Sequence, residues 1–153
     1  PMGSEIKARN LSPYFLAMAS ADPLSQPLQR LQVIKGYLKN GVPVEKIYDI
    51  ACPGNNQPDL KTYRCPNNGA KVNLSDCSTY QGTSATAFSV LWKDPEFETK
   101  SDAFYYLRVL ENPSCRWSTW DAIKNKREPR SDLPETIQER AWSSPIWLRT
   151  KSS

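Results

Sequence analysis

The chain has 153 residues, 39% of them hydrophobic, and a net charge of +4, which suits a single domain with one buried core. It contains no histidine, which excludes Ser-His-Asp and Cys-His catalysis and the imidazole ligands of most catalytic zinc sites. Its basic residues are scattered, unlike the clustered stripe of a nucleic-acid-binding protein, and no apolar run approaches the ~20 residues that cross a bilayer.

The first four residues, Pro1-Met2-Gly3-Ser4, are typical of the remnant that protease cleavage and cloning leave, so residues 1–4 are set aside from fold reasoning. Residues 5–13 then form an N-terminal lead-in. We expect one β-sandwich domain over residues 14–150 and a short C-terminal tail over residues 151–153.

The most secure local structure is a β-hairpin. Residues 28–38 alternate in part, with Leu31, Val33 and Tyr37 on one face and Arg30 and Gln32 on the other. The dipeptide at 40–41 is Asn-Gly, a strong signal for a two-residue hairpin turn. Residues 44–51 supply the returning strand.

Later segments predict further short strands and two helical pieces. Turn-forming residues dominate 52–86, with one short strand expected at 70–74, and strands follow at 87–92 and 104–110. The second of these is apolar on both faces except at Arg108, as in a central strand, and we expect Tyr105, Leu107 and Val109 to face the core. A capping-box spacing at Ser118–Asp121 predicts a short helix. Residues 135–140 predict a further helical turn, and residues 142–150 a closing strand whose beginning lies at a sheet edge, because of Pro145.

The fold class predicted from this pattern is mostly β: an immunoglobulin-like antiparallel β-sandwich with long disulfide-tied loops and one or two short helices. Thirteen prolines fit many turns better than a helical bundle.

Four cysteines, Cys52, Cys65, Cys77 and Cys115, are even in number and lack the close pairs of a zinc knuckle. We interpret them as disulfides and favour Cys52–Cys65 with Cys77–Cys115 among the three connectivities, because this pairing closes the local loop first. A bridge over such a loop is worth about 3 kcal/mol. Disulfides imply a periplasmic or secreted protein. The alternatives are four reduced buried thiols and a four-thiolate metal site.

Several ordered motifs resemble a bacterial family, known as domain of unknown function three-six-zero-four, over about residues 14–147. They are LQRLQVIKG at 28–36, YDIAC at 48–52, CPNNGA at 65–70, AFYYLRVLENP at 103–113, CRWST at 115–119 and IQERAWSSPIW at 137–147.

The resemblance is to the C-terminal portion of this family, whose members are long, exported proteins. Their N-terminal part resembles metallohydrolases of the polymerase-and-histidinol-phosphatase (PHP) type, which bind divalent metals. None of those ligand motifs occurs here, so the resemblance implies no catalytic, cofactor-binding or metal-binding residue in this chain. It implies a non-catalytic β-sandwich that packs on the parent's catalytic domain or shapes its cleft. Contact between copies in a homo-oligomer is a further option.

Two Arg-Trp groupings flank one long loop and form a candidate contact surface. Arg and Trp are the residue types most often found at binding hot spots. The candidate residues are Arg116, Trp117, Trp120, Glu139, Arg140 and Trp142. The alternative is that Trp117 and Trp142 are core side chains, with Glu139 and the arginines as a local ion-pair network.

Two other classes of function stay open at this stage. An autonomous binding module would use exposed Trp, Tyr and Arg to hold a glycan or a cell-surface partner. An independent enzyme would need carboxylates or the four thiols to do all the chemistry.

Overall fold

The computed structural model describes residues 1–7, 11–99 and 101–150, and its larger layer is a six-stranded sheet. The sheet has the order β1-β12-β8-β3-β4, and β11 also pairs with β8. The bounds are β1 Glu5–Lys7, β3 Leu28–Lys39, β4 Val42–Ala51, β8 Ala103–Glu111, β11 Arg140–Trp142 and β12 Ile146–Arg149. All pairs are antiparallel except β1 with β12. The residues predicted as a central strand, 104–110, thus form the centre of the sheet.

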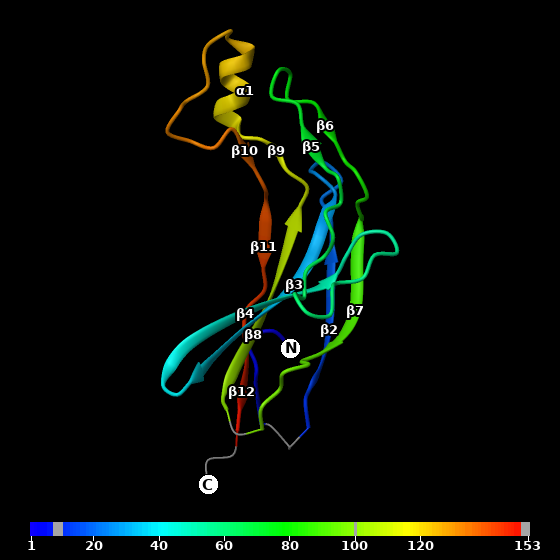
Figure 1. Cartoon of the computed structure of the whole chain (residues 1–153), viewed down its shortest axis with the longest axis vertical. Coiled ribbons are helices and arrows are strands. Elements are labelled where there is room, and N and C mark those ends of the chain that lie inside the picture. Colours follow the sequence, from blue (N-terminus) through cyan, green and yellow to red (C-terminus); the bar gives the residue numbers. More distant parts are fainter. Residues whose placement is uncertain (8–10, 100, 151–153) are drawn as a thin grey trace.

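The second layer is a two-stranded ribbon of β2 (Tyr14–Ser20) and β7 (Ala87–Lys93), which covers one face of the larger sheet (Figure 1). The core lies between the layers. Burial alternates along β2 and β7, as expected for strands with one face on the core, whereas residues 31–36 of β3 are buried on both faces. Core side chains include Phe15 and Ala17 from β2, Phe88 from β7, and Tyr105 and Leu148 from the larger sheet. The predicted β-sandwich is confirmed; its immunoglobulin-like topology stays a prediction.

The predicted hairpin is confirmed as β3 and β4, which pair from Lys39 with Val42 to Leu31 with Ala51. Both turn residues, Asn40 and Gly41, have positive φ values of 52° and 77°. This is the conformation that a two-residue hairpin turn requires and that Asn-Gly adopts readily.

One charged pair is enclosed between the layers. Lys35 of β3 points inward, and its Nζ lies 2.6 Å from the Asp94 carboxylate just after β7. The same carboxylate accepts hydrogen bonds from the Tyr105 hydroxyl at 2.8 Å and from the backbone N–H of Glu96 at 2.8 Å. A buried charge needs such partners, because its lost hydration is costly.

The end of the molecule beyond the sheet carries the small elements: β5 (Lys71–Val72), β6 (Thr79–Tyr80), β9 (Ser114–Cys115), β10 (Thr136–Ile137) and α1 (Trp117–Lys124) (Figure 1). Disulfides join Cys52 to Cys65 and Cys77 to Cys115. These are the pairs favoured from the sequence, and the structure has them in place of free thiols or a thiolate metal site. The second bridge ties the loop between β5 and β6 to β9.

The predicted helix exists, but its N-cap lies two residues earlier than predicted. Arg116 occupies the N-cap position without a side-chain cap, so the capping box at Ser118 is wrong. The Thr119 hydroxyl instead donates to the backbone carbonyl of Glu135 at 2.8 Å, which joins the helix to the segment that returns to the sheet.

The predicted helical turn at 135–140 is wrong. This segment is extended and forms β10 and the start of β11, because it pairs with β9 and then with β8. The closing strand at 142–150 is interrupted: β11 ends at Trp142, and β12 begins at Ile146 after Pro145. Here the backbone pairing with neighbouring strands determines the conformation, although the local sequence favours a helix.

The predicted lead-in contributes β1 to the sheet edge, and the segment before it continues the contact. The Gly3 N–H donates to the Pro145 carbonyl, and the Ser4 carbonyl accepts from the Trp147 N–H, both at 2.9 Å. That residues 1–4 are a cloning remnant stays a prediction. Residues 8–10 of the lead-in and the predicted tail, 151–153, lie outside the described residues.

Candidate contact surface

The β2–β7 ribbon covers only one face of the six-stranded sheet, and we call the opposite face the outer face. Alternation along each strand assigns its side chains. They are Arg30, Gln32, Ile34 and Gly36 of β3, Glu45, Ile47 and Asp49 of β4, Phe104, Tyr106 and Arg108 of β8, Arg140 and Trp142 of β11, and Trp147 and Arg149 of β12.

A polar row crosses four strands of this face. The register places Asp49 opposite Gln32, Gln32 opposite Arg108, and Arg108 opposite Trp142. Arg108 Nε donates to Gln32 Oε1 at 2.7 Å, and Gln32 Nε2 donates to Asp49 Oδ1 at 2.6 Å. The Gln32 amide thereby orients the guanidinium of Arg108 on the strand next to Trp142.

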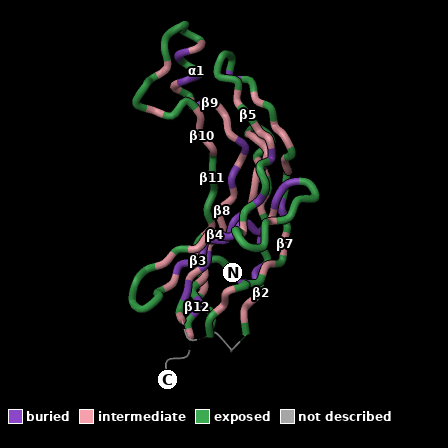
Figure 2. Tube along the Cα trace, viewed as in Figure 1, coloured by how far each residue is buried: buried purple, intermediate pink, exposed green. Residues whose placement is uncertain are grey.

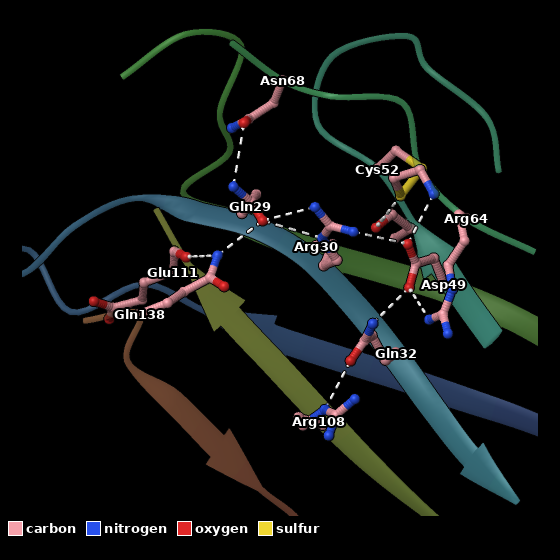
Figure 3. A network of polar contacts seen from close by, with 12 residues as sticks. Gln29, Arg30, Gln32, Asp49, Cys52, Arg64, Asn68, Arg108, Glu111 and Gln138 are labelled. Carbon is pink, nitrogen blue, oxygen red and sulfur yellow. Dashed lines mark hydrogen bonds and ion pairs between the residues drawn. A yellow bond between two sulfur atoms is a disulfide. The ribbon is translucent and has the colours of Figure 1, made fainter. Parts of the chain in front are cut away.

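Asp49 anchors the row because its carboxylate is fully buried and receives further donors (Figure 3). The backbone N–H of Cys65 donates to it at 2.8 Å, and the Cys52–Cys65 disulfide holds that loop against β4. Arg30 and Arg64 lie 3.3 Å and 3.5 Å from its oxygens. One carboxylate therefore faces several guanidinium groups, and the row has an excess of positive charge.

A second set of amides ties β11 to the sheet. Gln138 Nε2 donates to Gln29 Oε1 and to the Glu111 carbonyl, both at 2.8 Å. Gln29 also accepts from Arg30 and donates to Asn68 (Figure 3). The chain segment that enters β11 is thus fixed by the same network that anchors the arginines.

An aromatic row lies farther along the same face. Phe104 stacks with Tyr106, its neighbour on β8, with ring planes 11° apart, and lies 5.2 Å from the Trp147 ring. The Phe104 ring lies across Gly36, where an added Cβ would come within 2.2 Å of the ring. Glycine at this position lets the aromatic ring lie flat over the neighbouring strand.

Beside this row is a hollow of about 460 Å³. Its lining includes Leu38, Pro43, Glu45, Phe104, Trp147 and Arg149. Asp102 lies at the rim, where hydrogen bonds from the backbone and side chain of Thr150, with Arg149 nearby, hold the pKa of its carboxyl below the ordinary value. The hollow is therefore apolar at its base, with charges of both signs at its edge.

The structure separates the six predicted contact residues into two groups. Arg140 and Trp142 lie on the outer face, and Glu139 directly precedes them; Arg116, Trp117 and Trp120 lie at α1, at the far end of the molecule (Figure 1). The core-packing alternative is wrong for both tryptophans, because 76% of Trp117 and 58% of Trp142 is exposed. Arg116, Glu139 and Arg140 form no ion pair with a described residue, contrary to the predicted network.

Sequence reasoning missed Arg108, Phe104 and Trp147 as surface residues. Their signal was present in the alternation of residues 103–110, because the predicted inward set of Tyr105, Leu107 and Val109 leaves Phe104, Tyr106 and Arg108 on the other side. Figure 2 shows buried and partly exposed residues mixed along β8 and β3, and exposed ones along β11.

Within the described ranges, no group of three or more His, Cys, Asp or Glu side chains is placed to hold a metal ion. A search of the same residues finds no helix that combines the length and the apolar character needed to span a bilayer.

No curated protein and no solved structure matches the chain. Residues 1–150 match the model of a family described as "Protein of unknown function (DUF3604)". The match covers the sheet, the ribbon, both disulfides and the outer face, so the chain belongs to the DUF3604 family.

Proposed function

We propose that this chain is a non-catalytic contact module of a larger exported protein, and that its outer face packs on another domain of that protein. The observation that carries the proposal is the pairing of two side chains: Arg108, which is half-buried and held by a buried anchor, and Trp142, which is exposed on the next strand. In an interface, a side chain that is already ordered loses less conformational entropy on binding.

The residue types on the outer face support contact rather than chemistry. Aromatic and arginine side chains dominate binding hot spots, because they combine large contact area with directional hydrogen bonding. Only the Nε of Arg108 is hydrogen-bonded to a described residue. Its two terminal nitrogens are therefore placed to donate to a carboxylate or a carbonyl on a partner surface.

The family resemblance supports the identity of the partner. We infer that this β-sandwich is the C-terminal portion of its parent, and that the partner domain is a PHP-type, metal-dependent hydrolase whose cleft it packs against or shapes. The two disulfides favour the periplasm or the cell exterior, where such bonds persist. Any divalent metal would then belong to the parent's catalytic domain.

Hydrogen exchange tests this proposal directly. Amide protection along β8 and β11 should rise when this chain is part of the longer protein, compared with the chain alone. Arg108→Ala and Trp142→Ala in the longer protein should reverse the protection without lowering the melting temperature by more than a few degrees.

The matched control is Trp117→Ala, which removes an exposed tryptophan at α1, away from the outer face. Equal exchange in both contexts, or equal sensitivity to Trp117→Ala and Trp142→Ala, would contradict a contact role for this face.

A second candidate function is glycan binding, which the hollow beside Trp147 favours. Its apolar base is aromatic, and Glu45, Asp102 and Arg149 lie around it; few polar groups around an apolar base is the usual composition of a small-ligand site. Binding of soluble oligosaccharides by the isolated chain, lost in Trp147→Ala and kept in Trp142→Ala, would favour this function over domain packing.

A further inference from the structure

The edge of β2 that faces away from β7 is unpaired among the described residues, and no feature of β2 protects it. Its sequence, Tyr-Phe-Leu-Ala-Met-Ala-Ser, holds no charge and no proline, and its register with β7 has no bulge. Natural sheets normally protect a free edge with one of these features, because an open edge pairs with other strands.

The alternation of hydrogen-bonded and non-bonded pairs between β2 and β7 identifies which backbone N–H and C=O groups of β2 point away from β7. The Ala21 N–H donates to the Thr86 carbonyl at 2.7 Å, in the same register as Phe15 with Trp92. Antiparallel pairs alternate between bonded and non-bonded residues. The backbone groups of Tyr14, Leu16, Met18 and Ser20 therefore point to the free edge.

An apolar groove of about 490 Å³ runs beside the beginning of this edge. Its lining residues come from both layers and include Ile6, Phe15, Val33, Tyr105, Leu107 and Ile146. Several of them belong to the core or pack against it. The sandwich is thus open on the side where β2 faces β1 and β12.

We infer that the β2 edge and this groove accept an extended peptide strand from a partner, which completes the ribbon as a third strand. Such strand addition takes affinity from main-chain hydrogen bonds and specificity from alternate side chains. Partner residues opposite Phe15 and Ala17 point inward over Tyr105 and Ile146. Partner residues opposite Leu16 and Met18 remain on the solvent side.

Electrostatics restricts the chemistry of the inward positions. None of the described residues that line the groove has a charged side chain, and burying an unpaired charge there is costly. The partner strand therefore carries apolar side chains at alternate positions and no charge between them. The lack of charged side chains distinguishes the groove from the arginine-rich outer face.

A second copy of the chain fits the edge poorly. Antiparallel pairing of β2 with its own copy places a two-fold axis perpendicular to the ribbon, so both larger sheets lie on the same side. Because Ile6 of β1 and Ile146 of β12 line the groove beside the edge of β2, we expect the corresponding strands of a copy to compete for the same space. A single strand avoids this clash.

The test uses the whole chain and a synthetic peptide in which serine and valine alternate four times before two lysines. Bound peptide should slow hydrogen exchange at the amides of Leu16, Met18 and Ser20 by at least tenfold. The same peptide with N-methylated serines keeps its side chains but loses its edge-facing donors, and it should not bind.

Two proline variants distinguish an effect on the β2 edge from a general effect on the fold. Leu16→Pro removes a donor that points to the free edge, while Leu91→Pro, at its cross-strand partner on β7, removes a donor that points to the opposite edge. Both lose a leucine, and proline is tolerated where the N–H faces solvent. We expect at least tenfold weaker peptide binding for Leu16→Pro and unchanged binding for Leu91→Pro.

Three outcomes would overturn the inference. The first is that the peptide does not bind at about 1 mM, a concentration that detects even weak association. The second is that both proline variants weaken peptide binding equally. The third is that bound peptide protects amides away from β2 from hydrogen exchange. Protection of the same three amides that rises with protein concentration, without peptide, would instead identify a second copy as the occupant.

Discussion

Each face of the six-stranded sheet has a buried carboxylate beside it, and the two carboxylates differ in the exposure of their cationic partners. On the inner side, Asp94 is paired with Lys35, whose side chain is only 5% exposed. On the outer face, Asp49 is equally buried, but its partners Arg30 and Arg64 are 22% and 45% exposed. One pair is closed within the core, and the other extends from the interior to the surface.

This difference shows that a charged side chain can be ordered by hydrogen bonds that lead to a buried carboxylate, without being enclosed in the core itself. The inner pair serves the fold, because both of its members lose their hydration and depend on each other. The buried Asp49 carboxylate accepts a hydrogen bond from the Gln32 amide and holds it in place. Gln32 in turn accepts a hydrogen bond from Arg108 and orients it. A buried anchor can therefore orient the half-buried Arg108, whose terminal nitrogens have no hydrogen bond to a described residue.

The largest expected effect is at the inner pair. Asp94→Ala leaves the Lys35 ammonium and the Tyr105 hydroxyl without their carboxylate, and a buried charge that loses its partner costs about 3–5 kcal/mol. We expect the free energy of unfolding in urea to fall by that amount. Lys35→Met added to Asp94→Ala should recover part of the loss, and a double variant no more stable than the single one would argue against a coupled pair.

At the outer face, Asp49→Ala should cost less, about 2 kcal/mol, because the arginines can regain water while Cys65 N–H and the Gln32 amide lose an acceptor. The same urea measurement checks this value. The comparison between the faces would fail if Asp49→Ala destabilised the chain as much as Asp94→Ala. Arg108 should also become less ordered, and faster exchange of its Nε–H with solvent, measured by NMR, would report this change.

Much of the fold could be predicted from the sequence where short-range chemistry decides it. Asn40-Gly41 specifies its own turn, and the alternation of residues 104–110 assigns Tyr105, Leu107 and Val109 to the core. The segment at 135–140 could not be predicted in the same way, because its conformation depends on pairing with β9 and β8. Its local pattern gives no information about these distant partners.

The candidate site was only partly predictable, for a related reason. Arg140 and Trp142 could be identified by residue type, but Arg108 matters through its register with Gln32 and Trp142 on two different strands. Register across a sheet depends on long-range pairing. The open edge of β2 was also invisible, since its apolar run reads the same for a central strand and for an edge.

An intermediate effect is expected on the outer face, where the Phe104 ring lies over the backbone of Gly36. Gly36→Ala places a Cβ within 2.2 Å of the Phe104 ring, and such overpacking costs about 1 kcal/mol when the displaced group can swing toward solvent. The moved ring should change the fluorescence of neighbouring Trp147. In a Phe104→Ala background, Gly36→Ala should be nearly neutral; a persistent cost there would place the strain in the backbone instead.

The smallest effect concerns Glu96, at the solvent edge of the inner side, where Lys46 Nζ lies 2.6 Å from its carboxylate. This hydrogen bond from Lys46, followed by one from the Tyr48 hydroxyl, holds the pKa of Glu96 below its ordinary value of 4.5. A lowered folded-state pKa means that Glu96 stabilises the fold above pH 4.5 and loses this contribution as the pH falls further. Because the side chains of Lys46 and Glu96 are 40% and 38% exposed, Glu96→Gln should lower stability at neutral pH by less than about 1 kcal/mol.

In urea unfolding at successive pH values, the Glu96→Gln variant should therefore lose less stability than the wild-type chain below pH 4.5. Glu98→Gln is the matched control, since Glu98 forms no ion pair with a described residue. Parallel curves for wild type and Glu96→Gln would assign the acid sensitivity to other carboxylates. A converging pair of curves would show that even the exposed end of the inner cluster is electrostatically coupled to folding, as the enclosed Lys35–Asp94 pair is by burial.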